Sequence, residues 1–193
     1  MSRRRSASER LGATLLLALL CIAGRARAQA PADEAQIKAA FVFNFLKFVD
    51  WPATATRRSD EQLVVAIIGD GPSADAVTAF LTAKRVGERP IVVKVLNWDQ
   101  SLAGVHAAFV SETDARKRRR VFDAAASASV LSIGEGHDFA LRGGVIGLVV
   151  EEQRVRFDID ADAAEAARIR ISSKLLALGH AVHSGRNTSG EAP

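Results

Sequence analysis

The chain of 193 residues has one cysteine, one methionine, five prolines and no tyrosine. Because the cysteine, Cys21, lies near the N-terminus, the remainder of the chain has no thiol and can form no disulfide. The longest uncharged stretch, Leu11–Gly24, is 14 residues, and a membrane-spanning helix needs roughly 20. These absences exclude a disulfide framework, disfavour a membrane anchor and indicate a domain that relies on its own apolar core.

Signatures of catalysis and nucleotide binding are also missing. The chain has neither a G-x-x-x-x-G-K-[ST] phosphate-binding loop nor a G-x-S-x-G nucleophile elbow. His106 and His137 stand alone and His180 and His183 lie near the C-terminus, so ordinary surface histidines are favoured over metal ligands. No cofactor, metal or catalytic residue is therefore predicted, and a secreted hydrolase is the weakest functional hypothesis.

The N-terminus has the three parts of a secretory signal peptide. Four arginines between Arg3 and Arg10 precede the apolar run, which ends in an Ala-Arg-Ala cleavage pattern. We expect cleavage after Ala28 and export, with lipidation at Cys21 as the less favoured alternative because the residue before it is bulky. Removing six of 26 cations and one of 22 anions leaves 20 and 21, so the basic character belongs to the export signal and does not indicate nucleic-acid binding.

Apolar runs alternate with helical patterns in the remaining chain. Buried strands are expected at Leu63–Ile68, Ile91–Leu96, Ala107–Val110 and Val130–Ile133, with helices from Ser73 to Lys84 and from Arg116 to Ala128. A hairpin is expected over residues 145–160, with the acidic and basic residues of its second strand, Asp158 and Asp160 among them, on the solvent side. The predicted fold is a single α/β domain, residues 29–183, with a mixed, mostly parallel sheet flanked by helices, and residues 184–193 form a flexible tail.

The first helix carries an aromatic stripe. Ile37, Phe41, Phe45 and Phe48 recur at helical spacing and are expected to face the core, and Trp51-Pro52 is expected to end the helix. Such a stripe is more often core than a ligand or partner surface.

Two loops repeat a Gly-acid-Gly pattern after a strand. They are Gly69-Asp70-Gly71 and Gly134-Glu135-Gly136, at the strand ends where open α/β sheets bind ligands. The simpler interpretation is a tight strand-to-helix turn, and the alternative is a small-molecule pocket. Arg116–Arg120 is a run of five cations, either a solvated helix face or a contact for anionic lipid headgroups or an acidic partner.

Five segments carry a resemblance to a known family. Phe139–Gly147, Val155–Asp160 and Ile171–Leu176, together with Lys38–Phe41 and the Phe48–Pro52 segment, resemble the signature of the YfiR family. The family often has Asn where Asp160 stands and Met where Val145 stands. The disulfide-forming cysteines of its best-known member are absent here, so redox sensing through such bonds is not expected.

The resemblance implies a periplasmic, non-enzymatic regulator. Such a protein binds the periplasmic sensory region of an inner-membrane diguanylate cyclase, holds it inactive and so lowers cyclic-di-GMP and restrains biofilm formation. An outer-membrane lipoprotein can sequester the regulator, and a homodimer is expected. The output changes if the membrane partner is another signalling protein such as a histidine kinase, and the alternative function is a small-ligand-binding sensor module.

Nine residues form the candidate ligand or partner surface. They come from the two glycine loops and from the family segments: Asp70, Gly71, Gly134, Glu135, Gly136, Arg142, Ser172, Ser173 and Lys174. On the structural interpretation, Gly143-Gly144 turns into a strand and Ser172 or Ser173 caps the last helix. On the functional interpretation, Arg142 and Lys174 meet an anionic ligand or partner near the Gly134–Gly136 loop.

Overall fold

Strands and helices alternate along the chain, as the apolar runs predict. The computed structural model describes residues 30–52 and 61–185, so the expected signal peptide and most of the expected tail lie outside the described residues. In chain order the elements are α2 (Ala30–Phe45), β1 (Val49–Asp50), β2 (Leu63–Ile68), α4 (Pro72–Leu81), β3 (Arg85–Val86), β4 (Arg89–Leu96), β5 (Ala107–Val110), α5 (Ala115–Ala128), β6 (Leu131–Glu135), α6 (Asp138–Leu141), β7 (Ile146–Glu151), β8 (Arg154–Asp160), α7 (Ala161–Ala166), β9 (Arg170–Ile171), α8 (Ser173–Leu178) and β10 (Ala181–His183).

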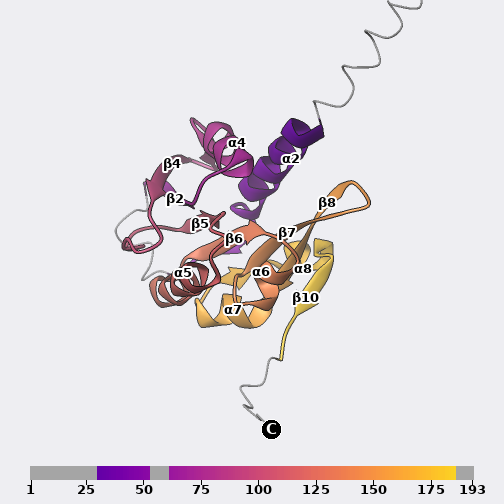
Figure 1. The fold of residues 1–193 in the computed structure, drawn as a ribbon. Helices are drawn as coiled ribbons and strands as arrows, with labels where there is room; N and C mark the ends of the chain where they lie inside the picture. The colour runs from indigo at the N-terminus through magenta and orange to yellow at the C-terminus, as the bar shows by residue number, and fades with distance from the viewer. Residues whose placement is uncertain (1–29, 53–60, 186–193) are drawn as a thin grey trace, which may run out of the picture. The chain divides into compact units, whose positions relative to one another are not determined.

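A mixed sheet of eight strands, in the order β10-β8-β7-β6-β5-β2-β4-β3, organises the domain (Figure 1). The strands from β4 through β2, β5 and β6 to β7 are parallel to their neighbours, while the β7–β8 hairpin and the β3–β4 pair are antiparallel. The hairpin turns at Glu152 and Gln153, which both have positive φ, the geometry that suits a two-residue hairpin. The predicted fold class is confirmed.

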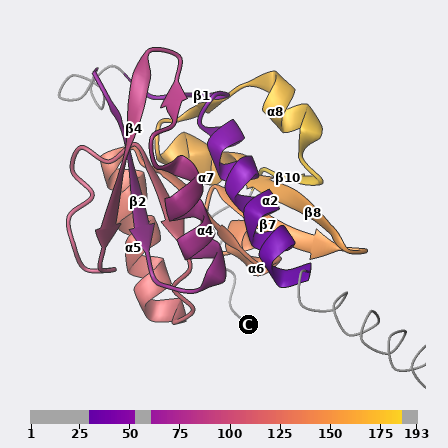
Figure 2. The same ribbon diagram turned by 90° about the horizontal axis from the view of Figure 1, so that it is seen from above.

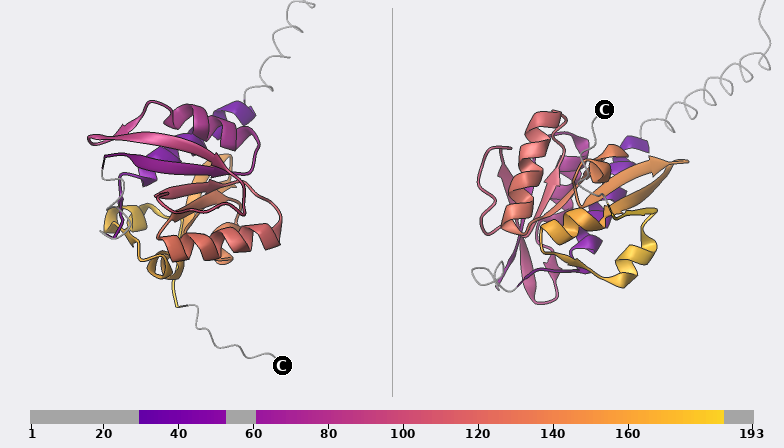
Figure 3. Two further views of the ribbon diagram at one scale, coloured as in Figure 1. Left: turned by 90° about the vertical axis from the view of Figure 1, so that its left-hand side faces the viewer. Right: turned by 90° about the horizontal axis from the view of Figure 1, so that it is seen from below.

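Helices cover both faces of the sheet because the central strands are apolar on both sides. Along β2, Leu63, Val65 and Ile67 pack with the cluster that includes α2 and α4, whereas alternate residues pack with α5 and α6. Figures 2 and 3 show α2 and α4 on one side of the sheet and α5 on the other. The expected core face of α5, Val121, Phe122 and Ala125, is buried.

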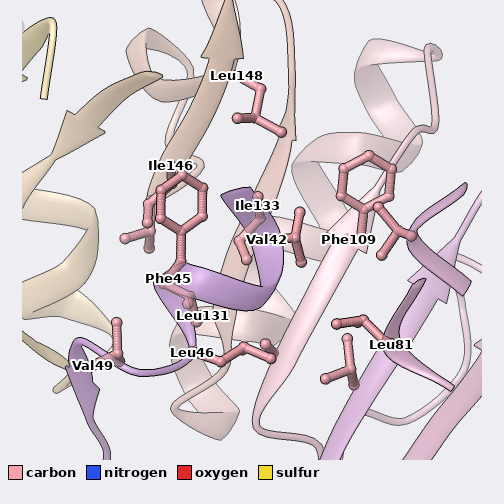
Figure 4. Packing of buried hydrophobic residues seen from close by; sticks show 14 of the residues in the cluster. Val42, Phe45, Leu46, Val49, Leu81, Phe109, Leu131, Ile133, Ile146 and Leu148 are labelled. Atoms are coloured by element: carbon pink, nitrogen blue, oxygen red, sulfur yellow. The ribbon is translucent and has the colours of Figure 1, made fainter. Parts of the chain in front are cut away.

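The core-facing side of α2 differs from the predicted aromatic stripe. Ile37 and Phe48 are 48% and 36% exposed, while the buried side chains belong to residues 35, 38, 39, 42, 45, 46 and 49. Phe45 meets the Phe157 ring edge-on at 4.9 Å between centroids, and Figure 4 shows it beside Ile146. The prediction is confirmed for Phe45, and Phe41 packs against the core, but it was wrong for Ile37 and Phe48.

Two expected helix boundaries also need correction. The helix α2 ends at Phe45, and Val49–Asp50 forms a strand paired with β9 instead of continuing toward Trp51. The helix α4 has Gly71 rather than Ser73 at its N-cap, and Ser73 is a buried helical residue. The first change follows from the pairing of β1 with the distant β9, whereas α4 begins at Pro72, a residue that suits the first turn of a helix.

The second hairpin strand, β8, is buried on both faces toward its C-terminal end. The alternating pattern predicted that its charged residues face the solvent, and for this end of the strand the prediction was wrong. Asp158 and Asp160 are 6% and 1% exposed. Asp160 accepts a hydrogen bond from the Ala163 amide at the start of α7, and Asp158 contacts His180. Buried carboxylates of this kind need such partners.

Every helix within the described ranges is too short or too polar to cross a lipid bilayer.

Candidate functional site

The carboxyl ends of β2, β4, β5, β6 and β7 meet at one edge of the sheet, because these strands are parallel. From β2 the chain crosses through α4 to β4, which is the neighbour of β2 on one side. From β5 it crosses through α5 to β6, which lies on the other side of β5, and α5 covers the face of the sheet opposite to α4. The connections therefore diverge between β2 and β5, which is where ligands settle in open α/β sheets. Both glycine loops lie at this edge.

Side chains and backbone fill the point where the connections diverge. A Cβ at Gly69 would lie 2.8 Å from the Glu112 amide nitrogen and from Ser111 Oγ. The Ser111 amide donates to the Ile68 carbonyl at 2.9 Å. Gly69 and Gly71 have φ of +97° and +109°, a conformation that favours glycine. The loop after β2 is thus built as a tight turn, with Asp70 exposed at its tip.

The second glycine loop contains a polar cluster that joins three elements. Glu135, at the end of β6, pairs with the Lys38 ammonium of α2 and accepts a hydrogen bond of 2.9 Å from Ser73 Oγ of α4. The Lys38 side chain is only 9% exposed, so this carboxylate offsets part of the cost of burying its ammonium. No sequence signal connects Ser73 with Glu135, 62 positions away, whereas a lysine among the small residues of the buried α2 face is a recognisable exception.

The candidate residue Gly134, and Gly144 with it, must be glycine because of an aromatic ring. Cβ atoms at Gly134 and Gly144 would each lie 2.1 Å from the Phe139 ring, at Cε2 and Cε1 respectively. Phe139 is fully buried and meets the Phe122 ring edge-on at 5.0 Å. Gly143 precedes β7 with φ +108°, as the expected turn into the strand requires.

Arg142 belongs to an ionic cluster between α5 and α6. Its Nε lies 2.6 Å from Asp138 Oδ2, and Arg118 Nη2 lies 3.1 Å from the same oxygen. Burial raises the pKa of Asp138, but the charge of Arg118 and the hydrogen bond from Arg142 lower the pKa by more, so it lies below its usual range. Arg142 also lines a groove of about 660 Å³ between α5, α6 and α7.

Ser172, Ser173 and Lys174 lie at the opposite edge of the sheet. The Ser172 side chain caps α8 by accepting from the Leu175 amide, while Ser173 and Lys174 are exposed. The preceding strand β9 pairs with β1. Trp51, next to β1, donates to the His106 carbonyl at the amino end of β5. The structure therefore does not bring Lys174 to the Gly134–Gly136 loop.

A further polar cluster, which the sequence did not reveal, fixes the start of β10. The His180 ring nitrogens lie 3.1 Å from Asp158 Oδ1 and 3.2 Å from Glu151 Oε2. These contacts hold the segment before β10 against the β7–β8 hairpin. Within residues 30–52 and 61–185, no three His, Cys, Asp or Glu side chains are arranged to hold a metal ion.

Comparisons with known proteins identify a family and a fold. A family model described as YfiR/HmsC-like matches residues 35–180. No curated protein matches. A conserved domain protein from Vibrio cholerae O1 biovar eltor is 11% identical, with a TM-score of 0.47, over 67% of this chain and 58% of its own. The ABC domain from Streptococcus pneumonia in complex with L-Trp is also 11% identical, with a TM-score of 0.52, over 77% and 60%. The present chain thus spans about three fifths of either solved chain, and the second likeness shows the fold alone.

Proposed function

Because the chain belongs to the YfiR/HmsC-like family, we propose that it is a periplasmic, non-enzymatic regulator of diguanylate cyclase signalling. It binds the periplasmic sensory region of an inner-membrane diguanylate cyclase and holds the enzyme inactive, which lowers cyclic-di-GMP and restrains biofilm formation. The signal peptide directs export and is cleaved after Ala28. The regulator acts as a homodimer, and an outer-membrane lipoprotein relieves repression by sequestering it.

The extent of the family match is the observation that carries this proposal. Residues 35–180 include the eight-stranded sheet except β10 and, within the described ranges, all helices apart from the first residues of α2. The polar clusters at Glu135, Asp138 and His180 have ion-pair partners within the fold. Such clusters stabilise an architecture and do not require a catalytic role, which agrees with a protein that acts through contact.

Repression by contact places a thermodynamic condition on the regulator. Binding the active and inactive conformations of the cyclase equally would change nothing, however tight the complex. A tenfold drop in the active-to-inactive ratio requires about 1.4 kcal/mol of preference for the inactive conformation. We therefore predict that the regulator binds a cyclase locked in its active conformation about tenfold more weakly than one locked in its inactive conformation.

A pull-down from solubilised membranes tests the proposal. The bait is the chain from Gln29, which retains every residue that the structure describes. Recovery of a diguanylate cyclase, with cyclic-di-GMP rising on deletion of the gene, is expected. Recovery of a different kinase or receptor would retain the regulatory role and change its output. No membrane partner, together with unchanged cyclic-di-GMP, would refute the proposal.

The groove beside Arg142 favours a second candidate function, a small-ligand sensor module. Its volume of about 660 Å³ and its lining of apolar and charged side chains match the size and character of small-molecule sites. A metabolite that binds the folded protein would raise the midpoint of thermal unfolding. A metabolite screen by thermal shift tests this function, and a shift that survives Arg142→Ala would place the ligand elsewhere.

A further inference from the structure

The first two turns of α5 concentrate positive charge where a helix tolerates it least. Arg116, Lys117, Arg118, Arg119 and Arg120 follow the N-cap residue Asp114, whose carboxylate accepts from the Arg116 and Lys117 amides, and the first turn itself contains no acidic residue. Cations near a helix N-terminus oppose the helix dipole and destabilise the helix. The exported chain has almost equal numbers of cations and anions, so this run is a local excess rather than a reflection of overall composition.

The fold neutralises only part of this charge. Arg118 pairs with Asp138, Arg119 with Asp123 at 3.0 Å, and Lys117 with Glu112 at 3.5 Å. Among the residues that the structure describes, no carboxylate lies within ion-pair distance of Arg116 or Arg120, and both side chains are exposed.

An indole ring lies beside these cations. The Lys117 ammonium and the Arg120 guanidinium lie over the Trp98 ring, 5.9 Å and 5.5 Å from its centroid. Trp98 follows β4 and is half-buried against the cluster that packs under α5. Tryptophan next to Arg and Lys is typical of side chains at the boundary between membrane and water, where the indole meets the headgroup layer.

We propose that Arg116, Lys117, Arg120 and Trp98, called here the α5 basic face, bind anionic phospholipid headgroups. Among the described residues, no carboxylate lies within ion-pair distance of Arg116 or Arg120, and such long basic side chains suit the diffuse charge of a headgroup layer. Lys117 adds to this charge although it also pairs with Glu112. A folded acidic partner would instead be bound by fixed, paired contacts. The inference rests on the proposed export, because it places the regulator on the outer surface of the membrane that holds the cyclase. Confinement there raises its effective concentration near its partner.

Vesicle sedimentation tests the α5 basic face without any cyclase. The chain from Gln29 is mixed with phosphatidylcholine vesicles that contain or lack phosphatidylglycerol. The double variant R116Q/R120Q is compared with R154Q/R168Q, a matched control in which two exposed arginines outside α5 are neutralised. Two cations at a membrane surface correspond to a loss of about 30-fold in partitioning (about 2 kcal/mol). We expect that loss for the first variant only, and we expect added salt to abolish wild-type binding.

Several outcomes would overturn the inference. One is that the wild-type protein binds equally to vesicles with and without phosphatidylglycerol. Another is that both double variants lose the same fraction of vesicle binding. A third is that α5 captures an acidic protein while the chain does not bind vesicles. The cyclase pull-down in detergent is a separate measurement. A protein that recovers the cyclase but ignores vesicles refutes only the membrane surface, whereas one that binds vesicles but recovers no partner refutes only the proposed function.

Discussion

The packing of Phe139 between two glycines leads to a quantitative prediction for Gly144→Ala. A Cβ there would lie 2.1 Å from Phe139 Cε1 and 2.4 Å from Cδ1, more than an ångström inside the roughly 3.5–4.0 Å optimum between carbon atoms. The ring has little room to move aside, because Gly134 lies against its opposite edge in the same way and the Phe122 ring packs against it at 5.0 Å between centroids. We therefore expect a loss of about 3 kcal/mol, the upper part of the overpacking range.

Thermal unfolding measures this loss. At roughly 2–4 °C per kcal/mol for a domain of this size, Gly144→Ala should lower the midpoint by about 6–12 °C. Gly179→Ala is the matched control. Its φ of −63° suits alanine, and the nearest atoms to its Cβ lie at 3.3–3.5 Å, so its effect should stay within about 1 kcal/mol.

A double-mutant cycle tests the cause of the destabilisation. Phe139→Leu removes ring atoms from a fully buried site and should cost about 1–2 kcal/mol, less than the 3–5 kcal/mol typical of Phe→Ala. Combined with Gly144→Ala, the loss should fall short of the sum by at least about 1 kcal/mol, since the new methyl group occupies space that the ring has left. A Gly144→Ala variant of wild-type stability, or strict additivity, would refute the argument. Retained partner binding at low temperature would show that the glycine acts through packing.

Three further predictions concern the polar clusters. Glu135→Gln removes the carboxylate that pairs with the buried Lys38 ammonium and should lower the free energy of unfolding, measured by chemical denaturation, by about 1–3 kcal/mol. The double variant K38M/E135Q should lose less stability, because it no longer buries the ammonium. An equal loss in the two variants would contradict the stabilising role of the ion pair. Because the pKa of Asp138 is depressed in the folded state, its stabilisation is present at neutral pH and is lost as the pH falls below about 4. The gap in melting temperature between wild type and Asp138→Asn should therefore narrow on acidification, and a constant gap would count against the ionic cluster. Removing the cap of α8 by Ser172→Ala should cost about 1 kcal/mol and speed hydrogen exchange in α8, whereas the exposed Lys174→Ala should change stability by less than about 0.5 kcal/mol.

Local patterns predicted most of the elements. The spans Leu63–Ile68 and Ala107–Val110 agree with β2 and β5 at both ends, because residues buried on both faces leave an uninterrupted apolar run with polar boundaries. The core side chains of α5 were predicted because its apolar residues recur on one side of an otherwise charged helix. The tip of the hairpin was predicted because a polar turn separates two apolar segments.

Predictions failed where a distant segment decided the outcome. The alternation of β8 predicts that Asp158 is exposed, yet it contacts His180 and β10 pairs beside it. Serine is a residue type common at helix N-caps, but the Ser73 hydroxyl donates to Glu135 instead. The nine candidate site residues, drawn from the glycine loops and the family segments, do not share one location. Arg142 lies beside α5, and Lys174 lies at the other edge of the sheet.

The sequence by itself determined the export pattern, the alternation of strands and helices, the absence of thiol chemistry and the family resemblance. These properties depend on composition and on spacing over a few residues. Only the tertiary structure decided which glycines flank Phe139, which carboxylate neutralises Lys38 and which arginines of α5 stay unpaired. Such contacts join side chains from positions far apart in the sequence, and the local spacing of apolar and polar residues cannot predict them.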